Sequence, residues 1–115
     1  MLTDEYRYKI LKIVEVKPDI SQRDLARELG VSLGKVNFCL KALIDVGLLK
    51  VANFKNNKNK LSYMYLITPT AVEQKTAITM RFLKHKIQEY ETLQAEIAEL
   101  RLESSDETRL EKAND

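Results

Sequence analysis

With 115 residues, of which 44% are hydrophobic and 31% charged, the chain is long enough to bury a core and too apolar to be a disordered protein. Its single cysteine excludes a disulfide framework, and it has neither a signal-peptide pattern nor an apolar run of about 18 residues, so we expect a cytoplasmic protein without a membrane partner. The net charge of +2 divides into +5 over residues 1–70 (12 basic, 7 acidic) and −3 over residues 71–115 (7 basic, 10 acidic), which indicates a polyanionic partner for the first part unless the asymmetry is chance.

The first predicted helix begins after Thr3, which can act as its N-cap, and ends near Val16. Acidic residues at positions 4 and 5 suit the positive end of the helix dipole. Apolar residues recur along it at helical spacing: Tyr6, Ile10, Ile13 and Val14. Pro18 then stops the helix and predicts a corner before the next element.

The stretch over residues 21–47 predicts two helices joined by a tight turn. Ser21 can cap the first of them, and Gly30 ends it because glycine adopts a left-handed backbone without steric cost. Ser32 can cap the second. A small residue, a turn glycine and a core residue follow one another at the spacing of a helix-turn-helix: Ala26, Gly30 and Val36.

The second helix of this pair has an apolar side and a polar side. At 100° per residue the apolar side contains Val36, Leu40 and Leu43, with Leu33 and Cys39 beside them. We predict that the other side enters the major groove of DNA through Ser32, Gly34, Lys35, Asn37, Phe38 and Lys41. Asparagine can bind adenine there, lysine can reach guanine or phosphate, and phenylalanine can contact a thymine methyl. The alternative is an ordinary solvated face with Phe38 covered by the next element.

The pattern then changes to that of a β-hairpin. Leu48–Phe54 and Leu61–Ile67 are predicted strands, and the polar residues 55–60 between them are a predicted turn, which together make a wing. The basic tip is predicted to contact DNA phosphates through Lys55, Asn57, Lys58 and Lys60. Arg23 and Arg27 on the preceding helix could hold a flanking phosphate. A basic tip judged alone more often serves only solubility, and its place directly after the predicted reading helix is what favours contact with DNA.

Thr68 and Pro69 predict the start of a long helix that continues to about Glu103. Its apolar residues fall on one heptad frame and predict a dimerisation surface: Leu83, Tyr90, Leu93, Ile97 and Leu100. The alternative is a helix packed back on its own domain. Residues 104–115 lack the apolar stripe, and we expect them to be disordered.

Catalysis and metal binding have no support in the sequence. His85 is the only histidine and has no companion ligand at a metal-binding spacing. Cys39 fits a buried apolar position better than a reactive thiol. A phosphate-binding glycine loop and a nucleophile elbow are both missing, so we predict a protein that is not an enzyme and needs no cofactor or metal.

The order of these elements resembles the winged-helix regulators of the MarR family. The residues that carry the resemblance are SQRDLARELGVSLGKVNFCLKALIDVGLLK and YLITPTA. In that family a strand ending in Leu-Thr-Pro opens the helix after the wing, and a glycine follows two residues later; here Ile67 interrupts the first motif and Ala71 replaces the glycine. The segment GKVNFCLKALIDVGL is similar to small MarR-type regulators associated with exopolysaccharide gene clusters.

The resemblance implies a homodimeric transcriptional regulator, most simply a repressor bound to the nucleoid, that reads a short pseudo-palindrome. Typical MarR proteins have an additional helix before the first one here, which walls a small-ligand pocket, so an inherited effector pocket is doubtful. We therefore predict a mostly α fold with a two-stranded wing, divided into a winged helix-turn-helix DNA-binding domain (1–68), a coiled-coil-like dimerisation helix (69–103) and a disordered tail (104–115). A protein-interaction adaptor without its own DNA specificity is the alternative.

Overall fold

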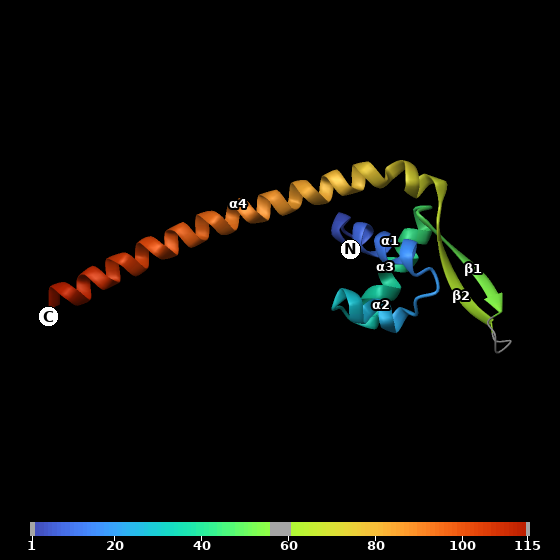
Figure 1. The fold of residues 1–115 in the computed structure, drawn as a ribbon, viewed down its shortest axis with the longest axis horizontal. Coiled ribbons are helices and arrows are strands. Elements are labelled where there is room, and N and C mark those ends of the chain that lie inside the picture. Colours follow the sequence, from blue (N-terminus) through green and yellow to red (C-terminus); the bar gives the residue numbers. More distant parts are fainter. Residues whose placement is uncertain (1, 56–60, 115) are drawn as a thin grey trace. The chain divides into compact units, whose positions relative to one another are not determined.

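The computed structural model describes the backbone of residues 2–55 and 61–114 and the side chains of residues 2–53 and 63–107. Its elements follow one another as α1 (Asp4–Val16), α2 (Gln22–Leu29), α3 (Leu33–Asp45), β1 (Leu49–Lys55), β2 (Leu61–Ile67) and α4 (Pro69–Asn114) (Figure 1). The described part of the chain is mostly helical, with one antiparallel hairpin and a long C-terminal helix. The predicted winged-helix fold is confirmed.

Local hydrogen bonds set the helix boundaries as the sequence predicts. The hydroxyl of each predicted cap accepts a backbone N–H from three residues further on, at Thr3, Ser21, Ser32 and Thr68. Gly30 closes α2 with a φ of 68°, in the left-handed region. Gly47 closes α3 in the same way with a φ of 77°, and the N–H of Leu48 returns to the carbonyl of Leu43 at 2.9 Å. Leu48 therefore belongs to the helix closure, and β1 begins one residue later than expected.

The two strands pair antiparallel, with Leu49 opposite Ile67 at the base of the hairpin and Lys55 opposite Leu61 near its tip. Tyr65 on β2 is buried, and its N–H donates to the carbonyl of Pro18 at 2.8 Å. This bond ties the wing to the corner between α1 and α2. The orientation of the wing is thus fixed by a contact between segments far apart in the sequence.

One hydrophobic core joins α1, α2, α3, the base of the hairpin and the first turns of α4. Its buried side chains are Ile10, Val14, Ile20, Leu25, Ala26, Val36, Cys39, Leu40, Leu43, Leu48, Leu49, Tyr65, Ala71 and Ile78. The last two come from α4, seven residues apart on one side of the helix. The core therefore includes residues of α4, which lie beyond the predicted domain boundary at residue 68.

The compact unit that contains the helix-turn-helix covers residues 1–82, and the predicted functional boundary after residue 68 stays a prediction. The ring of Phe82 on α4 packs against that of Tyr8 on α1 at a centroid distance of 5.2 Å. Next to it, the Nε of Arg81 donates to both carboxylate oxygens of Asp4 at 3.1 Å. Helix capping at Thr68 marks where α4 begins, whereas side-chain packing decides which of its turns belong to the first unit.

The second unit covers residues 83–115 and is helical through Asn114. The sequence predicts that the helix ends near Glu103 and that residues 104–115 are disordered. In the structure the helix continues past Glu103 to Asn114. Residues 104–114 contain neither glycine nor proline and include alanine, leucine, lysine, arginine and glutamate, which are strong helix formers. Loss of the apolar stripe therefore does not end the helix.

Candidate nucleic-acid interface

Helix α3 buries one side completely and exposes the other. Val36, Cys39, Leu40 and Leu43 are buried, whereas Gly34, Phe38 and Lys41 are exposed. The predicted division of the helix into a core side and an outward side is therefore correct for these residues. The outward side of α3 is therefore an accessible helical surface within the described residues.

The prediction that Leu33 lies beside the core is wrong, because its side chain is 45% exposed. It is the first residue of α3 and lies at the margin of the apolar side. Helical periodicity gives the side on which a residue lies but not how far the core extends toward the end of the helix. Leu33 therefore joins the outward surface, together with Phe38, which is 49% exposed.

Asn37 is half-buried and takes part in a chain of side-chain hydrogen bonds. Its Nδ2 donates to Oε1 of Gln22 at 3.3 Å, and Nε2 of Gln22 donates to the hydroxyl of Tyr65 at 3.3 Å. The chain joins α3, α2 and β2. The structure thus places the predicted adenine reader in an internal contact, and it adds Gln22, which no sequence pattern had indicated.

Lys35 projects toward α1 as well as along α3. Its ammonium lies 5.0 Å from the ring centroid of Tyr6 and 5.8 Å from that of Phe38. A cation over an aromatic face at this range is stabilised by about 0.5–1 kcal/mol at an exposed site. These contacts hold the positive charge at the side of the outward surface.

Gly34 has no packing role within the described residues, since an added Cβ would meet nothing within 4 Å. Glycine inside a helix costs roughly 1 kcal/mol relative to alanine. A position that does not need glycine for folding fits close approach by a ligand. Ser32 just before it uses its hydroxyl oxygen to accept the N–H of Lys35 at 3.1 Å.

The remaining predicted contacts are only partly described. Arg23 and Arg27 are exposed on α2, and Arg27 forms a weak surface ion pair with Asp24 at 3.4 Å. Lys55 ends β1, but its side chain lies outside the described residues. Asn57, Lys58 and Lys60 lie outside them altogether. Their contact with phosphates stays a prediction.

Cys39 fills a core position, as the sequence analysis expects. Burial raises the pKa of its thiol, and the positive charge of Lys35 lowers it by a smaller amount. A neutral thiol is the form that a buried apolar site favours. Cys39 is therefore a packing residue in this structure.

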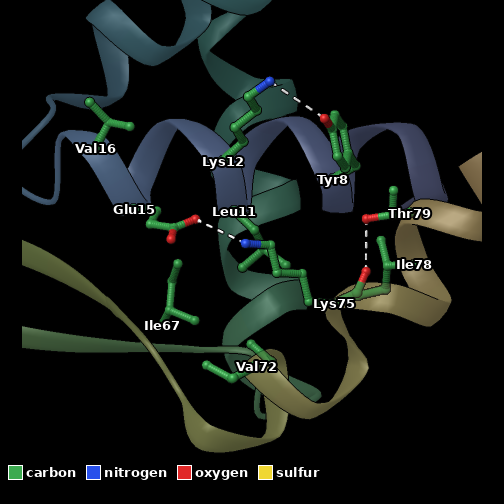
Figure 2. A pocket seen from close by; sticks show the side chains of 11 residues that line it. Tyr8, Leu11, Lys12, Glu15, Val16, Ile67, Val72, Lys75, Ile78 and Thr79 are labelled. Atoms are coloured by element: carbon green, nitrogen blue, oxygen red, sulfur yellow. Dashed lines mark hydrogen bonds and ion pairs between the residues drawn. The ribbon is translucent and has the colours of Figure 1, made fainter.

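A cavity of about 490 Å³ lies between α1, the end of β2 and the first turns of α4 (Figure 2). Its walls are mostly apolar, and Lys75 on α4 pairs with Glu15 on α1 at 3.8 Å across it. The Nζ of Lys12 lies 3.5 Å from the Tyr8 hydroxyl at its edge. The volume falls within the range of small-molecule sites, and the sequence leaves open whether the protein has an effector.

The second unit exposes an apolar stripe along α4. All five predicted dimerisation residues are exposed: Leu83, Tyr90, Leu93, Ile97 and Leu100. Ile87 is exposed as well and lies beside Lys86, the one charged residue on the heptad frame. An exposed stripe of this kind is typical of a surface that another chain covers.

Comparison with known proteins supports the assignment of the first unit. A protein-family model described as winged helix-turn-helix DNA-binding matches residues 3–50, which span α1, α2, α3 and the start of β1. Neither a curated protein nor a solved structure gives a significant match. Within the described residues, every helix is too short or too polar to cross a membrane. Residues 3–50 of this chain therefore match a winged helix-turn-helix DNA-binding domain.

Proposed function

We propose that the chain is a sequence-specific regulator of transcription that binds double-stranded DNA as a homodimer. The observation that carries the proposal is the outward surface of α3, which is exposed along a helix whose other side is buried, within residues that match a winged helix-turn-helix DNA-binding family model. The net charge of +5 over residues 1–70 supports a polyanionic partner (12 basic and 7 acidic residues).

In this proposal α3 enters the major groove and the wing contacts the phosphates beside it. Lys41 is exposed on the outward surface and supplies a charge for guanine or phosphate. Lys55, Lys58 and Lys60 of the wing neutralise further phosphates. Each phosphate so neutralised releases counterions, so the slope of log K against log salt steepens by about 0.9.

The exposed stripe on α4 supports dimerisation. Leu83, Tyr90 and Ile97 recur at intervals of seven residues, and Leu93 and Leu100 form the second row of the same frame. Pairing of two such stripes would place two α3 helices on one duplex. Half-sites about 34 Å apart would then lie on the same side of the DNA.

The resemblance to MarR-type regulators supports a repressor that acts by occupying a promoter. Its similarity to the small regulators associated with exopolysaccharide clusters makes promoters of such genes the first candidates for its operator. These finer statements rest on the segment GKVNFCLKALIDVGL and on the strand that runs into Thr68 and Pro69.

Light scattering after size exclusion, combined with DNA titration at two salt concentrations, tests the proposal. We expect a dimer whose DNA affinity falls steeply with salt. Lys41→Ala should weaken binding and flatten the salt slope, whereas Lys84→Ala, at an exposed position of the second unit, should leave both unchanged. A monomer with salt-independent DNA binding would rule the proposal out.

A protein-interaction adaptor is the second candidate, and the exposed ring of Phe38 favours it because an apolar side chain at the surface also suits a protein partner. The same Lys41→Ala variant separates the two functions. Loss of DNA binding with an intact fold supports the regulator. Unchanged DNA affinity together with loss of a protein partner supports the adaptor.

A further inference from the structure

We propose that α3 selects its DNA site through apolar contacts of Leu33 and Phe38 with thymine methyl groups. The inference deepens the proposed function and rests on it, because α3 must lie in the major groove for these contacts to form. It replaces the expectation that Asn37 reads adenine by hydrogen bonding. Thymine at defined positions then carries the specificity.

Exposure of large apolar side chains on α3 is the first observation. Leu33 and Phe38 are about half-exposed, while Val36, Leu40 and Leu43 on the same helix are almost fully buried. They are the first and sixth residues of α3, in the half of a recognition helix that contacts base edges. Because about half of each side chain stays exposed, much of its apolar surface is left unburied by the core. Contact with apolar groups of a partner would bury that surface.

The position of the two residues around the helix is the second observation. Five residues at 100° each place Leu33 and Phe38 about 140° apart, on either side of Gly34. Gly34 adds no side chain to this arc, and an added Cβ there would meet nothing within 4 Å among the described residues, whereas Asn37 and Lys41 also lie within the arc. In the proposed complex the backbone of α3 approaches the base edges at Gly34, and Leu33 and Phe38 reach them from its two sides.

The third observation is that the side chain of Asn37 is already hydrogen-bonded within the protein. Its Nδ2 donates to Gln22, which in turn donates to Tyr65, and all three are at least half-buried. Turning Asn37 toward a base would break this chain and leave the Gln22 oxygen without that donor. The polar group best suited to adenine is thus used within the protein.

Thymine supplies the chemistry that matches the surface. Its C5 methyl is an apolar group at the floor of the major groove, and cytosine presents a hydrogen at the same position. Apolar contact with this methyl is an established way for a side chain to distinguish A·T from G·C pairs. A leucine and a phenylalanine that flank a glycine fit two such methyls per half-site.

The test uses a duplex selected from a random pool, in which each thymine is replaced in turn by deoxyuridine. This replacement removes the methyl and keeps every hydrogen-bonding group. We expect about a fourfold loss of affinity at each contacted thymine of the wild-type complex, the value of one buried methyl group. Substitution at positions that α3 does not contact should change nothing.

Two variants assign the methyls to side chains. Phe38→Ala should bind thymine and deoxyuridine equally at one position, and Leu33→Ala should do so at another. Val46→Ala is the matched control, since Val46 is an exposed apolar residue at the other end of α3, and it should keep the full discrimination. Circular dichroism confirms that each variant is folded.

The outcomes distinguish this inference from the function on which it rests. Sequence-specific binding that is unaffected by deoxyuridine at every position overturns the inference and leaves the proposed function standing. The inference is also overturned, and the proposed function left standing, if the wild-type protein prefers adenine to 7-deazaadenine and Asn37→Ala abolishes that preference. Asn37 would then read adenine directly. If no sequence is enriched from the pool, both the inference and the proposed function fail.

Discussion

Nδ2 of Asn37 on α3 donates a hydrogen bond to Oε1 of Gln22 on α2 at 3.3 Å, and Nε2 of Gln22 donates to the hydroxyl of Tyr65 on β2. One polar chain thus joins the helix that faces outward, the helix that supports it and the strand of the wing. Its geometry gives Asn37 a role in holding these three elements together.

Removal of either end of the Asn37–Gln22 bond should destabilise the domain. We expect Asn37→Ala and Gln22→Ala each to lower the free energy of unfolding by about 1 kcal/mol, because a half-buried hydrogen bond is lost. The double variant should cost less than the sum of the two single variants. Urea denaturation measures all four proteins, and strictly additive effects would show that the bond does not form.

Gly34→Ala should separate folding stability from DNA binding. The new Cβ meets nothing within 4 Å among the described residues, so we expect a gain of about 0.5–1 kcal/mol in the free energy of unfolding. DNA affinity should fall, because the methyl group keeps α3 away from the base edges. Gly30→Ala is the control: its φ of 68° makes any side chain strained, so that variant should lose stability. An unchanged DNA affinity in Gly34→Ala would contradict close approach at this residue.

Ile78 and Leu93 lie on the same helix but in different units, so their truncation should have different effects. Ile78 is 1% exposed, and Ile78→Ala should lower the free energy of unfolding by about 2–5 kcal/mol through the cavity that it leaves. Leu93 is 54% exposed, and Leu93→Ala should reduce dimerisation while changing the stability of residues 1–82 little. Thermal denaturation and light scattering measure the two effects, and equal loss of stability in both variants would count against a first unit that ends at Phe82.

The buried thiol of Cys39 should lower the free energy of unfolding as the pH becomes alkaline. Burial raises the pKa of its thiol, so the unfolded chain releases this proton at a lower pH than the folded chain. The contribution of the thiol is complete below the pKa of the unfolded state and is lost as the pH rises toward the folded pKa. Cys39→Ala should therefore lose less stability than the wild type between about pH 7 and about pH 10. Urea midpoints at the two pH values measure the difference, and parallel losses in both proteins would contradict it.

The sequence predicted those features that local chemistry determines. Serine and threonine caps, the left-handed Gly30 and the strand over residues 61–67 each depend on neighbours within a few positions, and the structure has each of them where the sequence indicates. The apolar side of α3 also follows from spacing alone. The sequence alone therefore predicts a winged helix.

Features that depend on contacts between distant residues could not be predicted in this way. Gln22 and Tyr65 are 43 residues apart, and no pattern in either segment indicates that they meet. The exposure of Leu33 depends on where the core ends, and the inclusion of α4 up to Phe82 depends on its packing against Tyr8. Periodicity assigns a residue to a side of a helix, whereas three-dimensional packing decides which turns are covered.

Selection of bound sequences from a random DNA pool tests the central claim most directly. If two copies of the chain read DNA through α3, the enriched sequences should form a pseudo-palindrome whose half-sites have centres about 10–10.5 base pairs apart. The preference should weaken in Leu93→Ala, which removes part of the exposed stripe on α4. A pool that shows no enrichment, or an enriched site without two-fold repetition, would contradict reading by a dimer.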